Sequence, residues 1–523
     1  MFTIPKKISI KPFKIPNTLP EYHIPKKNLN INKLEYKYLI SDLFNIKVDI
    51  TNFELIKKII NDFITTSNKH LKIIQEIEFY EDFVVIGDLH GNIFDLQRIL
   101  IINNEIDYSK LNKNYIILGD FIDRGGYSFE CSIVIFLLKI LNPNKVYIIR
   151  GNHELIFSEY KDFSYDNYFI SELLDRIMIK KEGLNGKQSM NTKSFFTYDT
   201  PELRTRIDIS EKNTDLKLKY RTDKDFINIV DLFKTAFQYL PIAIKLTFEI
   251  GFDEIEFPMF FVHGGIPKIL GNIDKINEYI SYDVLRSFDV GRTDYMNTEL
   301  NFDTPKMESV YNIIIGFCYH NASKELGFTK VKRTSFGPNV TKKFLEINDL
   351  QYIFRGHQPT KTTYFTNVDK KILLSYRFHK AHGNKLLTLH SNSKFWKNSK
   401  FNGRYGSFAV IKYCGDLIIY SFNESDVHVR KPIKLTKGYI CTKKFEDMEN
   451  NPVSNTTYIL KQKKDETFLT YLCKLEYDIS IGDDINIINY VKNINSYPYI
   501  TKEVQAKADE YKKFLMEYSN TTT

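Results

Sequence analysis

The segment FVVIGDLHGN at residues 83–92 joins a short apolar run to a short polar motif, called a polar word below. The same pattern occurs twice more. YIILGDFIDRGG spans residues 115–126, and VYIIRGNHE spans residues 146–154. Each apolar run is short, rich in β-branched or aromatic residues and bounded by glycine, as is typical of strands buried on both faces. The three segments therefore predict three strands, each with a polar word at its carboxyl end.

Helices are expected between these strands. Residues 94–102 and 129–141 place apolar residues at helical spacing: Leu96, Ile99 and Leu100 in the first segment, and Ile133, Phe136, Leu137 and Ile140 in the second. Strands that alternate with helices predict right-handed crossovers and a largely parallel sheet. The fold class is therefore α/β.

Polar side chains of three kinds gather at the predicted strand ends. Asp88, His90, Asp120, Asn152 and His153 all follow directly after an apolar run. Ligands of α/β proteins collect beyond the carboxyl ends of parallel strands, so these side chains should lie close together. Carboxylate, imidazole and amide groups in one place indicate a site for two metal ions.

Two later words extend this pattern. Residues 257–262 form another apolar run that ends in His263, and residues 352–354 precede Arg355, Gly356 and His357. A histidine beside a glycine at a strand end can turn its ring toward a metal ion. Both histidines are therefore candidate ligands.

The ordered words GDLHGN, GDFIDRGG, RGNHE, VHGG and FRGHQ resemble the serine/threonine phosphoprotein phosphatases, a branch of the metallophosphoesterases that includes calcineurin. KTAFQYLPIAI (234–244) and LLTLHS (386–391) extend the likeness over roughly residues 50–425. Any one word alone would be an ordinary solvated turn, whereas five in one order favour a shared site. The resemblance implies a four-layer α/β/β/α sandwich with mixed sheets and a dinuclear metal site at the strand C-terminal ends.

The resemblance also assigns the metal ligands. It gives one ion Asp88, His90 and Asp120, and the other Asn152, His263, His357 and the shared Asp120. The cofactors implied are two divalent metal ions, and mixed nitrogen and oxygen ligands fit Mn, Fe or Zn better than Mg or Ca. The implied reaction is hydrolysis of a phosphomonoester by direct attack of a metal-bridging hydroxide.

Four further residues resemble the catalytic groups of this family. His153 resembles the general acid, Asp123 the carboxylate that orients it, and Arg124 a phosphate clamp, with Arg333 in KVKRTSFG as the candidate second clamp. The chain departs from the family after LLTLHS, where it reads SNSKFW. Phe395 or Trp396 then stands near the place of a family tyrosine, and neither ring carries a phenolic hydroxyl.

A serine/threonine protein phosphatase acting on phosphoprotein substrates is the expected function, with regulatory protein partners left open. Three alternatives compete with it: a hydrolase of diadenosine polyphosphates or other small phosphates, a phosphodiesterase or nuclease, and a pseudophosphatase that binds partners. The nuclease relatives usually continue the last motif as GHxH, whereas His357 is followed by Gln358 and Pro359. That departure argues against a nuclease.

Composition narrows the class of protein. The five cysteines among 523 residues form no CxxC and no close pair, so disulfides and zinc fingers are not expected. The absence of a long apolar stretch and of a signal-peptide core predicts an intracellular protein, cytoplasmic or nuclear, that makes no membrane contact. The net charge of +9 is attributed to lysine-rich coding rather than to nucleic-acid binding.

The chain divides into three predicted parts. Residues 1–45 form a basic, proline-containing arm that runs extended, and residues 426–523 form an accessory region of unknown role. Residues 46–425 form the catalytic domain, which begins with a helix capped by Thr51. That domain carries inserts at 181–225, read as a polar loop, and at 376–385, whose His379 and His382 receive no role.

Overall fold

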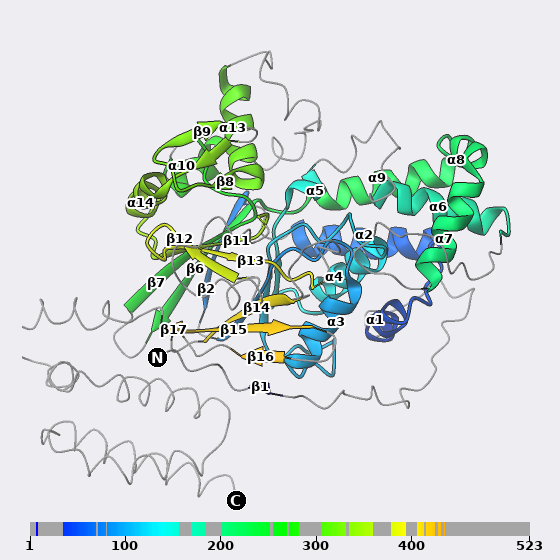
Figure 1. The fold of residues 1–523 in the computed structure, drawn as a ribbon, viewed down its shortest axis with the longest axis horizontal. Helices are drawn as coiled ribbons and strands as arrows, with labels where there is room; N and C mark the ends of the chain where they lie inside the picture. The colour runs from blue at the N-terminus through cyan, green and yellow to red at the C-terminus, as the bar shows by residue number, and fades with distance from the viewer. Residues whose placement is uncertain are drawn as a thin grey trace, which may run out of the picture.

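Two mixed β-sheets pack face to face in the computed structural model of the chain, with helices on their outer sides (Figure 1). The structure describes these residues: 7–8, 35–68, 72–79, 81–155, 169–184, 201–250, 255–268, 271–281, 305–330, 334–358, 378–393, 405–412, 415–423, 427–429 and 433–434. The metallophosphoesterase sandwich expected from the sequence is confirmed by this arrangement.

The first sheet is built around the three strands predicted from the polar words. These are β3 (Phe83–Ile86), β4 (Asn114–Ile117) and β5 (Val146–Ile148), which pair in parallel. They are joined by α3 (Ile93–Ile102) and α4 (Ser128–Leu141), as the helical spacing predicted. On the other side of β3, the sheet continues antiparallel through β14 (Gly406–Ile411), β15 (Asp416–Phe422) and β16 (Val427–Val429).

The second sheet has the order β12 (Phe378–Ala381), β13 (Leu386–Leu389), β11 (Tyr352–Arg355), β7 (Ile255–Val262), β6 (Ala243–Ile250) and β2 (Ile74–Phe79). Strands β7, β11 and β13 run parallel to one another, while β6 is antiparallel to β7. A small separate sheet contains β8 (Asn321–Ala322), β10 (Thr334–Phe336) and β9 (Phe328–Lys330). Two of the predicted histidine-bearing strands, β7 and β11, are thus neighbours.

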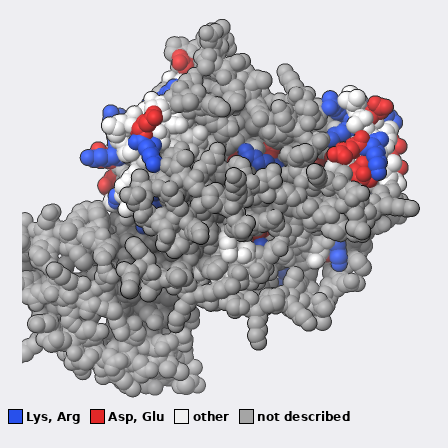
Figure 2. Space-filling view, in the orientation of Figure 1, with Lys and Arg blue, Asp and Glu red and all other residues white. Residues whose placement is uncertain are grey.

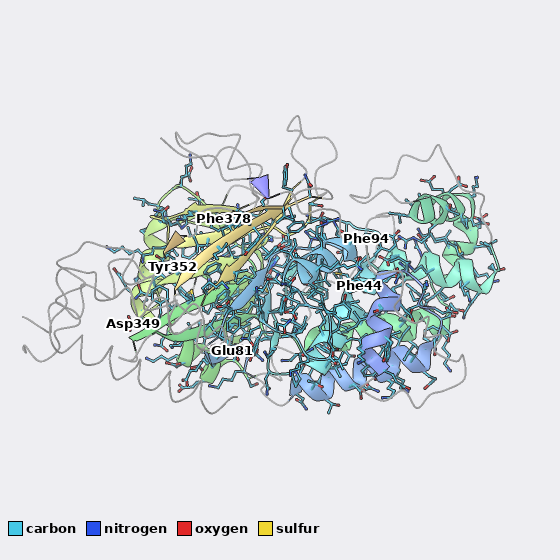
Figure 3. All side chains as sticks on the ribbon, turned by 90° about the horizontal axis from the view of Figure 1, so that it is seen from below. Phe44, Glu81, Phe94, Asp349, Tyr352 and Phe378 are labelled. Atoms are coloured by element: carbon cyan, nitrogen blue, oxygen red, sulfur yellow. The ribbon has the colours of Figure 1, made fainter. Side chains whose placement is uncertain are left out.

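Alternation along β3 shows how the layers form. Phe83 and Val85 pack into the core between the two sheets, whereas Val84 and Ile86 pack into the core under the helices. All four side chains are buried, because each face of the strand is covered. Figure 3 shows the same division, with Tyr352 and Phe378 on the second sheet and Phe44 and Phe94 on helices that cover the first.

Helices cover both outer faces. On the first sheet, α2 (Phe53–Ser67) packs against α4 and α9 (Lys224–Gln238), and the rings of Phe63 and Phe136 stack with centroids 4.1 Å apart. On the second sheet, Phe260 of β7 contacts Phe317 of α13 (Pro305–Tyr319) and Phe344 of α14 (Pro338–Ile347). The helix α10 (Ile273–Tyr279) lies on the same side as α13 and α14 (Figure 1).

The folded part begins earlier than the sequence analysis placed it. Within the predicted arm of residues 1–45, residues 36–44 form the helix α1 (Tyr36–Phe44), which packs against α4. Leu39, Ile40 and Leu43 are buried there at helical spacing, a pattern that the prolines upstream had obscured. The cap of α2 is Asn52, whose side chain accepts from the Leu55 N–H, rather than Thr51.

The folded part also extends beyond residue 425. Strand β16 pairs with β15, and β17 (Ile433–Lys434) pairs with β15 at its other end. Near the N-terminus, β1 (Lys7–Ile8) pairs antiparallel with β16. The predicted boundary at residue 425 is therefore too early, and the remainder of the predicted accessory region lies outside the described residues.

The described residues of the insert predicted as a loop at 181–225, namely 181–184 and 201–225, are largely helical. After α6 (Phe169–Lys181), it contains α7 (Pro201–Lys212) and α8 (Thr214–Tyr220), and α9 begins at its end. These helices bury polar groups: Lys217 lies 3.0 Å from Asp175, and the Ser210 hydroxyl donates to the same carboxylate. The apolar periodicity is weak because paired polar side chains occupy part of the buried face.

The insert at 376–385 supplies β12 and the turn into β13. His382 is 2.7 Å from both the Thr341 hydroxyl and the Ser323 carbonyl, so its ring is used in structural contacts.

Figure 2 shows Lys and Arg mixed with Asp and Glu over α6 to α8 and over α10 and α14. None of the described helices has both the length and the apolar composition needed to cross a membrane.

Candidate metal centre

The polar words meet where the two sheets come together. Asp88 follows β3, Asp120 follows β4, and Asn152 begins the short helix α5 (Asn152–Leu155) after β5. His263 and His357 follow β7 and β11 of the second sheet. The structure thus brings together the six residues proposed as metal ligands, and all of them are buried.

Five residues of these words have a left-handed backbone, which non-glycine residues adopt only at a cost. Their φ angles are 47° for His90, 50° for Asp120, 66° for Asp123, 63° for Arg124 and 65° for His357. Such conformations persist where surrounding contacts fix them, and they cluster at functional sites. Here they turn the chain sharply after β3, β4 and β11, so that the polar side chains that follow these strands face one place.

Asp88 and His90 form one set of donors. The His90 Nδ1–H donates to the Ile122 carbonyl at 3.1 Å, which leaves Nε2 with its lone pair toward the site. That nitrogen lies 3.8 Å from Asp88 Oδ2 and 3.9 Å from Asp120 Oδ2. Asp88 Oδ2 is buried and has no hydrogen bond in the described part of the chain.

Asn152, His263 and His357 form a second set around Asp120. The His263 Nδ1–H donates to the Leu118 carbonyl at 2.7 Å, so its Nε2 faces inward. This Nε2 is 3.1 Å from both Asn152 Oδ1 and Asp120 Oδ2, and His357 Nδ1 is 2.7 Å from Asn152 Oδ1. Asp120 therefore lies between the two sets.

The donor atoms fit metal ions. The ligand atoms of Asp88 and His90, and those of Asp120, His263 and His357, fall within groups whose members lie no more than 4.8 Å apart. Nitrogen and oxygen ligands about 2.0–2.2 Å from a common ion lie about 3–4 Å from each other, which matches most of these spacings. The arrangement can therefore hold metal ions.

The electrostatics of the cluster also favour the binding of a cation. Burial raises the pKa of Asp88 to about 6, and burial lowers the pKa of His90 well below its usual range. Burial opposes protonation of His263, but Asp120 outweighs it and raises the pKa of that imidazole to about 9. A divalent cation favours ionised carboxylates and neutral imidazoles, and would thus supply beside Asp120 the positive charge that this carboxylate favours.

His153, Asp123 and Arg124 lie beside the Asp120 end of the cluster. The His153 Nδ1–H donates to Asp123 Oδ2 at 2.6 Å, and the other oxygen of Asp123 accepts from the Phe169 N–H at 2.7 Å. His153 Nε2 then faces the site, 3.9 Å from Asp120 Oδ2. The Arg124 guanidinium reaches over it, with Nη2 at 3.1 Å from His153 Nε2 and Nη1 at 3.3 Å from His90 Nε2.

Two residues of this site, Glu154 and His390, were not predicted from the sequence. Glu154 is buried, and its carboxylate accepts from the backbone N–H groups of Asp120, Phe121 and Gly151, at 2.8, 3.0 and 2.9 Å. His390 follows β13 and lies against Asp88. The position of His390 directly after the LLTL run was the signal in the sequence that could have identified it.

The proposed clamp Arg333 and the pair Phe395 and Trp396 lie outside the described residues.

Comparison with known proteins places the chain in a family. The calcineurin-like phosphoesterase family matches residues 82–361. A probable serine/threonine-protein phosphatase of Encephalitozoon cuniculi is 26% identical over 62% of this chain, and the PP2A-like serine/threonine-protein phosphatase PPG1 of Saccharomyces cerevisiae is 25% identical over 60%. Serine/threonine-protein phosphatase 5 of Arabidopsis thaliana is 26% identical over 55%.

These matches cover only part of the relatives, namely 49%, 67% and 38% of their respective lengths. Among solved structures, a Saccharomyces cerevisiae phosphatase described as similar to human PP5 aligns with a TM-score of 0.41 and 18% identity, covering 71% of this chain and 89% of that one. The family match spans more than half of the 523 residues and contains the five words through His357. The chain belongs to the calcineurin-like phosphoesterase family.

Proposed function

We propose that this chain is a metal-dependent serine/threonine protein phosphatase, which hydrolyses phosphomonoesters of phosphoprotein substrates. The relatives reported above all carry the name serine/threonine-protein phosphatase, which supports this substrate class. The observation that carries the proposal is the His153–Asp123 pair facing the buried donor cluster at Asp120. A proton donor beside a cation site is what cleavage of a phosphate ester requires.

Two divalent cations would be held by the two donor sets. Asp88 and His90 would bind one and Asn152, His263 and His357 the other, while Asp120 would contact both. When bound, such ions neutralise phosphate charge and make a water molecule acidic enough to attack near neutral pH. Mixed imidazole, carboxylate and amide donors favour Mn, Fe or Zn.

Arg124 would bind the substrate phosphate. Its two terminal nitrogens lie near His90 and His153, so the guanidinium lies next to both the proposed cation site and the proposed proton donor. A planar guanidinium matches two phosphate oxygens at once and stays charged at every working pH. The phosphate would thereby be oriented with its ester oxygen toward His153.

His153 would protonate the departing serine or threonine oxygen. Asp123 fixes its Nδ1–H by the 2.6 Å hydrogen bond, so Nε2 is the nitrogen that would carry the transferable proton in the charged form of the ring. Asp123 is itself held by the Phe169 N–H and is fully buried. This rigid support keeps the ring in one orientation, and such acid catalysis typically contributes about 10²- to 10⁴-fold in rate.

The acid role can be tested with two substrates that differ in their leaving group. A serine alkoxide needs a proton to depart, whereas p-nitrophenolate is a weak base and departs without one. His153→Asn should lower kcat on a phosphoserine peptide by about 10²-fold or more, and should lower it much less on p-nitrophenyl phosphate. His382→Asn, at a histidine used in structural contacts outside the site, is the matched control. Equal losses on both substrates would contradict the acid role.

The substrate class can be tested with one panel in added manganese: phosphoserine and phosphothreonine peptides, a phosphotyrosine peptide, diadenosine tetraphosphate and a phosphodiester. The proposal predicts the highest kcat/KM for the phosphoserine or phosphothreonine peptide. A clear preference for diadenosine tetraphosphate would favour a small-phosphate hydrolase instead. Metal-loaded protein inactive on every substrate would favour a pseudophosphatase.

A further inference from the structure

We propose that His390 is an additional ligand of the metal ion held by Asp88, His90 and Asp120. The inference rests on the cation-binding part of the proposed function, and it adds a nitrogen donor from a strand outside the five polar words. With His390, each ion would have four protein ligands, because Asp120, Asn152, His263 and His357 already surround the other. The two metal sites would then have the same number of protein ligands.

The backbone fixes His390 beside Asp88. The two residues form a parallel bridge between the ends of β13 and β3, which belong to different sheets. The Asp88 carbonyl accepts from the Ser391 and Asn392 N–H groups at 3.1 and 2.9 Å, and the Ser407 N–H donates to the His390 carbonyl at 3.0 Å. Backbone hydrogen bonds on both sides therefore hold His390 in place, and the residue is 1% exposed.

The distances suit a shared ion better than a hydrogen bond. His390 Nε2 is 3.7 Å from Asp88 Oδ2, and His90 Nε2 is 3.8 Å from the same oxygen. Both separations exceed hydrogen-bond range, yet ligands about 2.0–2.2 Å from one ion can lie up to about 4 Å apart. The ligand atoms of Asp88, His90 and His390 all lie within 4.8 Å of one another.

The chemistry of the surroundings points the same way. The strand that leads to His390 is buried, with Leu386, Leu387 and Leu389 packed in the cores. An imidazole at such a place is costly to bury unless its nitrogens are used, and Asp88 Oδ2 beside it has no hydrogen bond among the described residues. An ion between them would use the nitrogen and the oxygen at once. Two imidazoles would bias this position toward transition metals over Mg or Ca.

The test compares cation binding by wild type and His390→Phe after metal removal with a chelator. Titration with Co²⁺, followed by calorimetry and by the visible absorption of bound cobalt, reports affinity and ligand field without any enzyme assay. Wild type is expected to bind two ions. In His390→Phe, one should bind about tenfold or more weakly, with an altered cobalt spectrum, while the other is unchanged. Thr388→Val, a buried position on the same strand, is the control and should match wild type.

Folding and binding can be separated by melting temperatures with and without Co²⁺. The metal-free His390→Phe variant should melt no lower than metal-free wild type, since the substitution removes a buried polar ring and leaves an aromatic ring in its place, whereas cobalt should raise its melting temperature less. If His390→Phe does not fold, His390→Leu replaces it with the same expectation. Two unchanged affinities and an unchanged spectrum would overturn the His390 assignment alone. A wild type that binds no cation would overturn the metal centre and the proposed function together.

Discussion

Gly356 lies where the second sheet meets the ligands of the first. A Cβ built there would fall 2.2 Å from Asp88 Oδ1 and 3.5 Å from His263 Nδ1, and the next backbone N–H, that of His357, donates to the same Asp88 oxygen. Gly356→Ala is therefore expected to displace the Asp88 carboxylate and lower phosphatase activity by about a hundredfold, since small misplacements at reacting groups have effects of that size.

Metal content and initial rates with added manganese would measure this effect. Gly271→Ala is the matched control, because the nearest atom to its Cβ is 3.4 Å away in a flexible isoleucine. Gly356→Ala protein with wild-type metal content and activity would show that Asp88 is not needed at that place.

At the level of residues, much of the site could be predicted because each group followed a recognisable strand. Asp88, Asp120 and His263 were all found in this way, and the structure brings them together. His390 obeys the same rule but was not proposed, because the resemblance assigned LLTLHS only to a strand. Glu154 could not be predicted from its neighbours in sequence, since two of its N–H partners, those of Asp120 and Phe121, lie in a loop about 30 residues away.

Helix α1 shows an element whose sequence signal was present but overlooked. Tyr36 is fully buried and donates its hydroxyl proton to Asp62 of α2 at 2.7 Å, and Leu39 is 1% exposed. Leu39→Ala is expected to reduce the free energy of unfolding by about 2–4 kcal/mol, because a buried leucine is replaced by a cavity.

Urea denaturation would measure that change. Tyr38→Ala, at the exposed face of the same helix, is the control and should change the free energy of unfolding by less than about 1 kcal/mol. Equal effects of the two substitutions would place α1 outside the core.

The helical insert supports the loop that carries Arg124. Arg206 of α7 donates to the Gly126 carbonyl at 3.0 Å and lies 3.8 Å from Glu172, which accepts from the N–H that begins α4. Arg206→Met is expected to cost about 1–3 kcal/mol of stability, because it removes the hydrogen bond to the buried Gly126 carbonyl and one of the two arginines beside Glu172. It should also raise KM for a phosphopeptide, since Gly126 is two residues from Arg124.

Chemical denaturation and steady-state kinetics would check both effects. The control is Lys212→Met, which removes an exposed ion pair with Asp208 in the same helix. It should change both the stability and KM little. An Arg206→Met protein that is destabilised but keeps its KM would mean that α7 does not position the loop.

The elements that the sequence analysis misjudged share a physical cause. Periodicity of apolar residues identifies helices that bury hydrocarbon, as in α2 and α4, but α7 and α8 bury charged groups such as Arg206 and Lys217. Whether a charged side chain is buried depends on partners from other helices, here Glu172 and Asp175 of α6. That information is tertiary, so local patterns could not supply it.

At the scale of the whole molecule, the site depends on the packing of the two sheets. The bond from the His357 N–H to Asp88 joins residues 269 positions apart, and the Asp88–His390 bridge joins the same two sheets. Cations bound to both sheets would stabilise the fold through that contact, by about 2.7 kcal/mol for one ion at a hundred times its dissociation constant. Metal binding and global stability should therefore change together.

One buried cluster is expected to bind two cations that share Asp120. The most direct measurement is the number of metal ions retained per chain, by mass spectrometry of dialysed protein, in wild type and in Asp120→Ala. Wild type loaded with manganese or zinc should retain two ions per chain, and the variant should retain fewer than one. Loaded wild type without metal, or a variant that retains both ions, would contradict it.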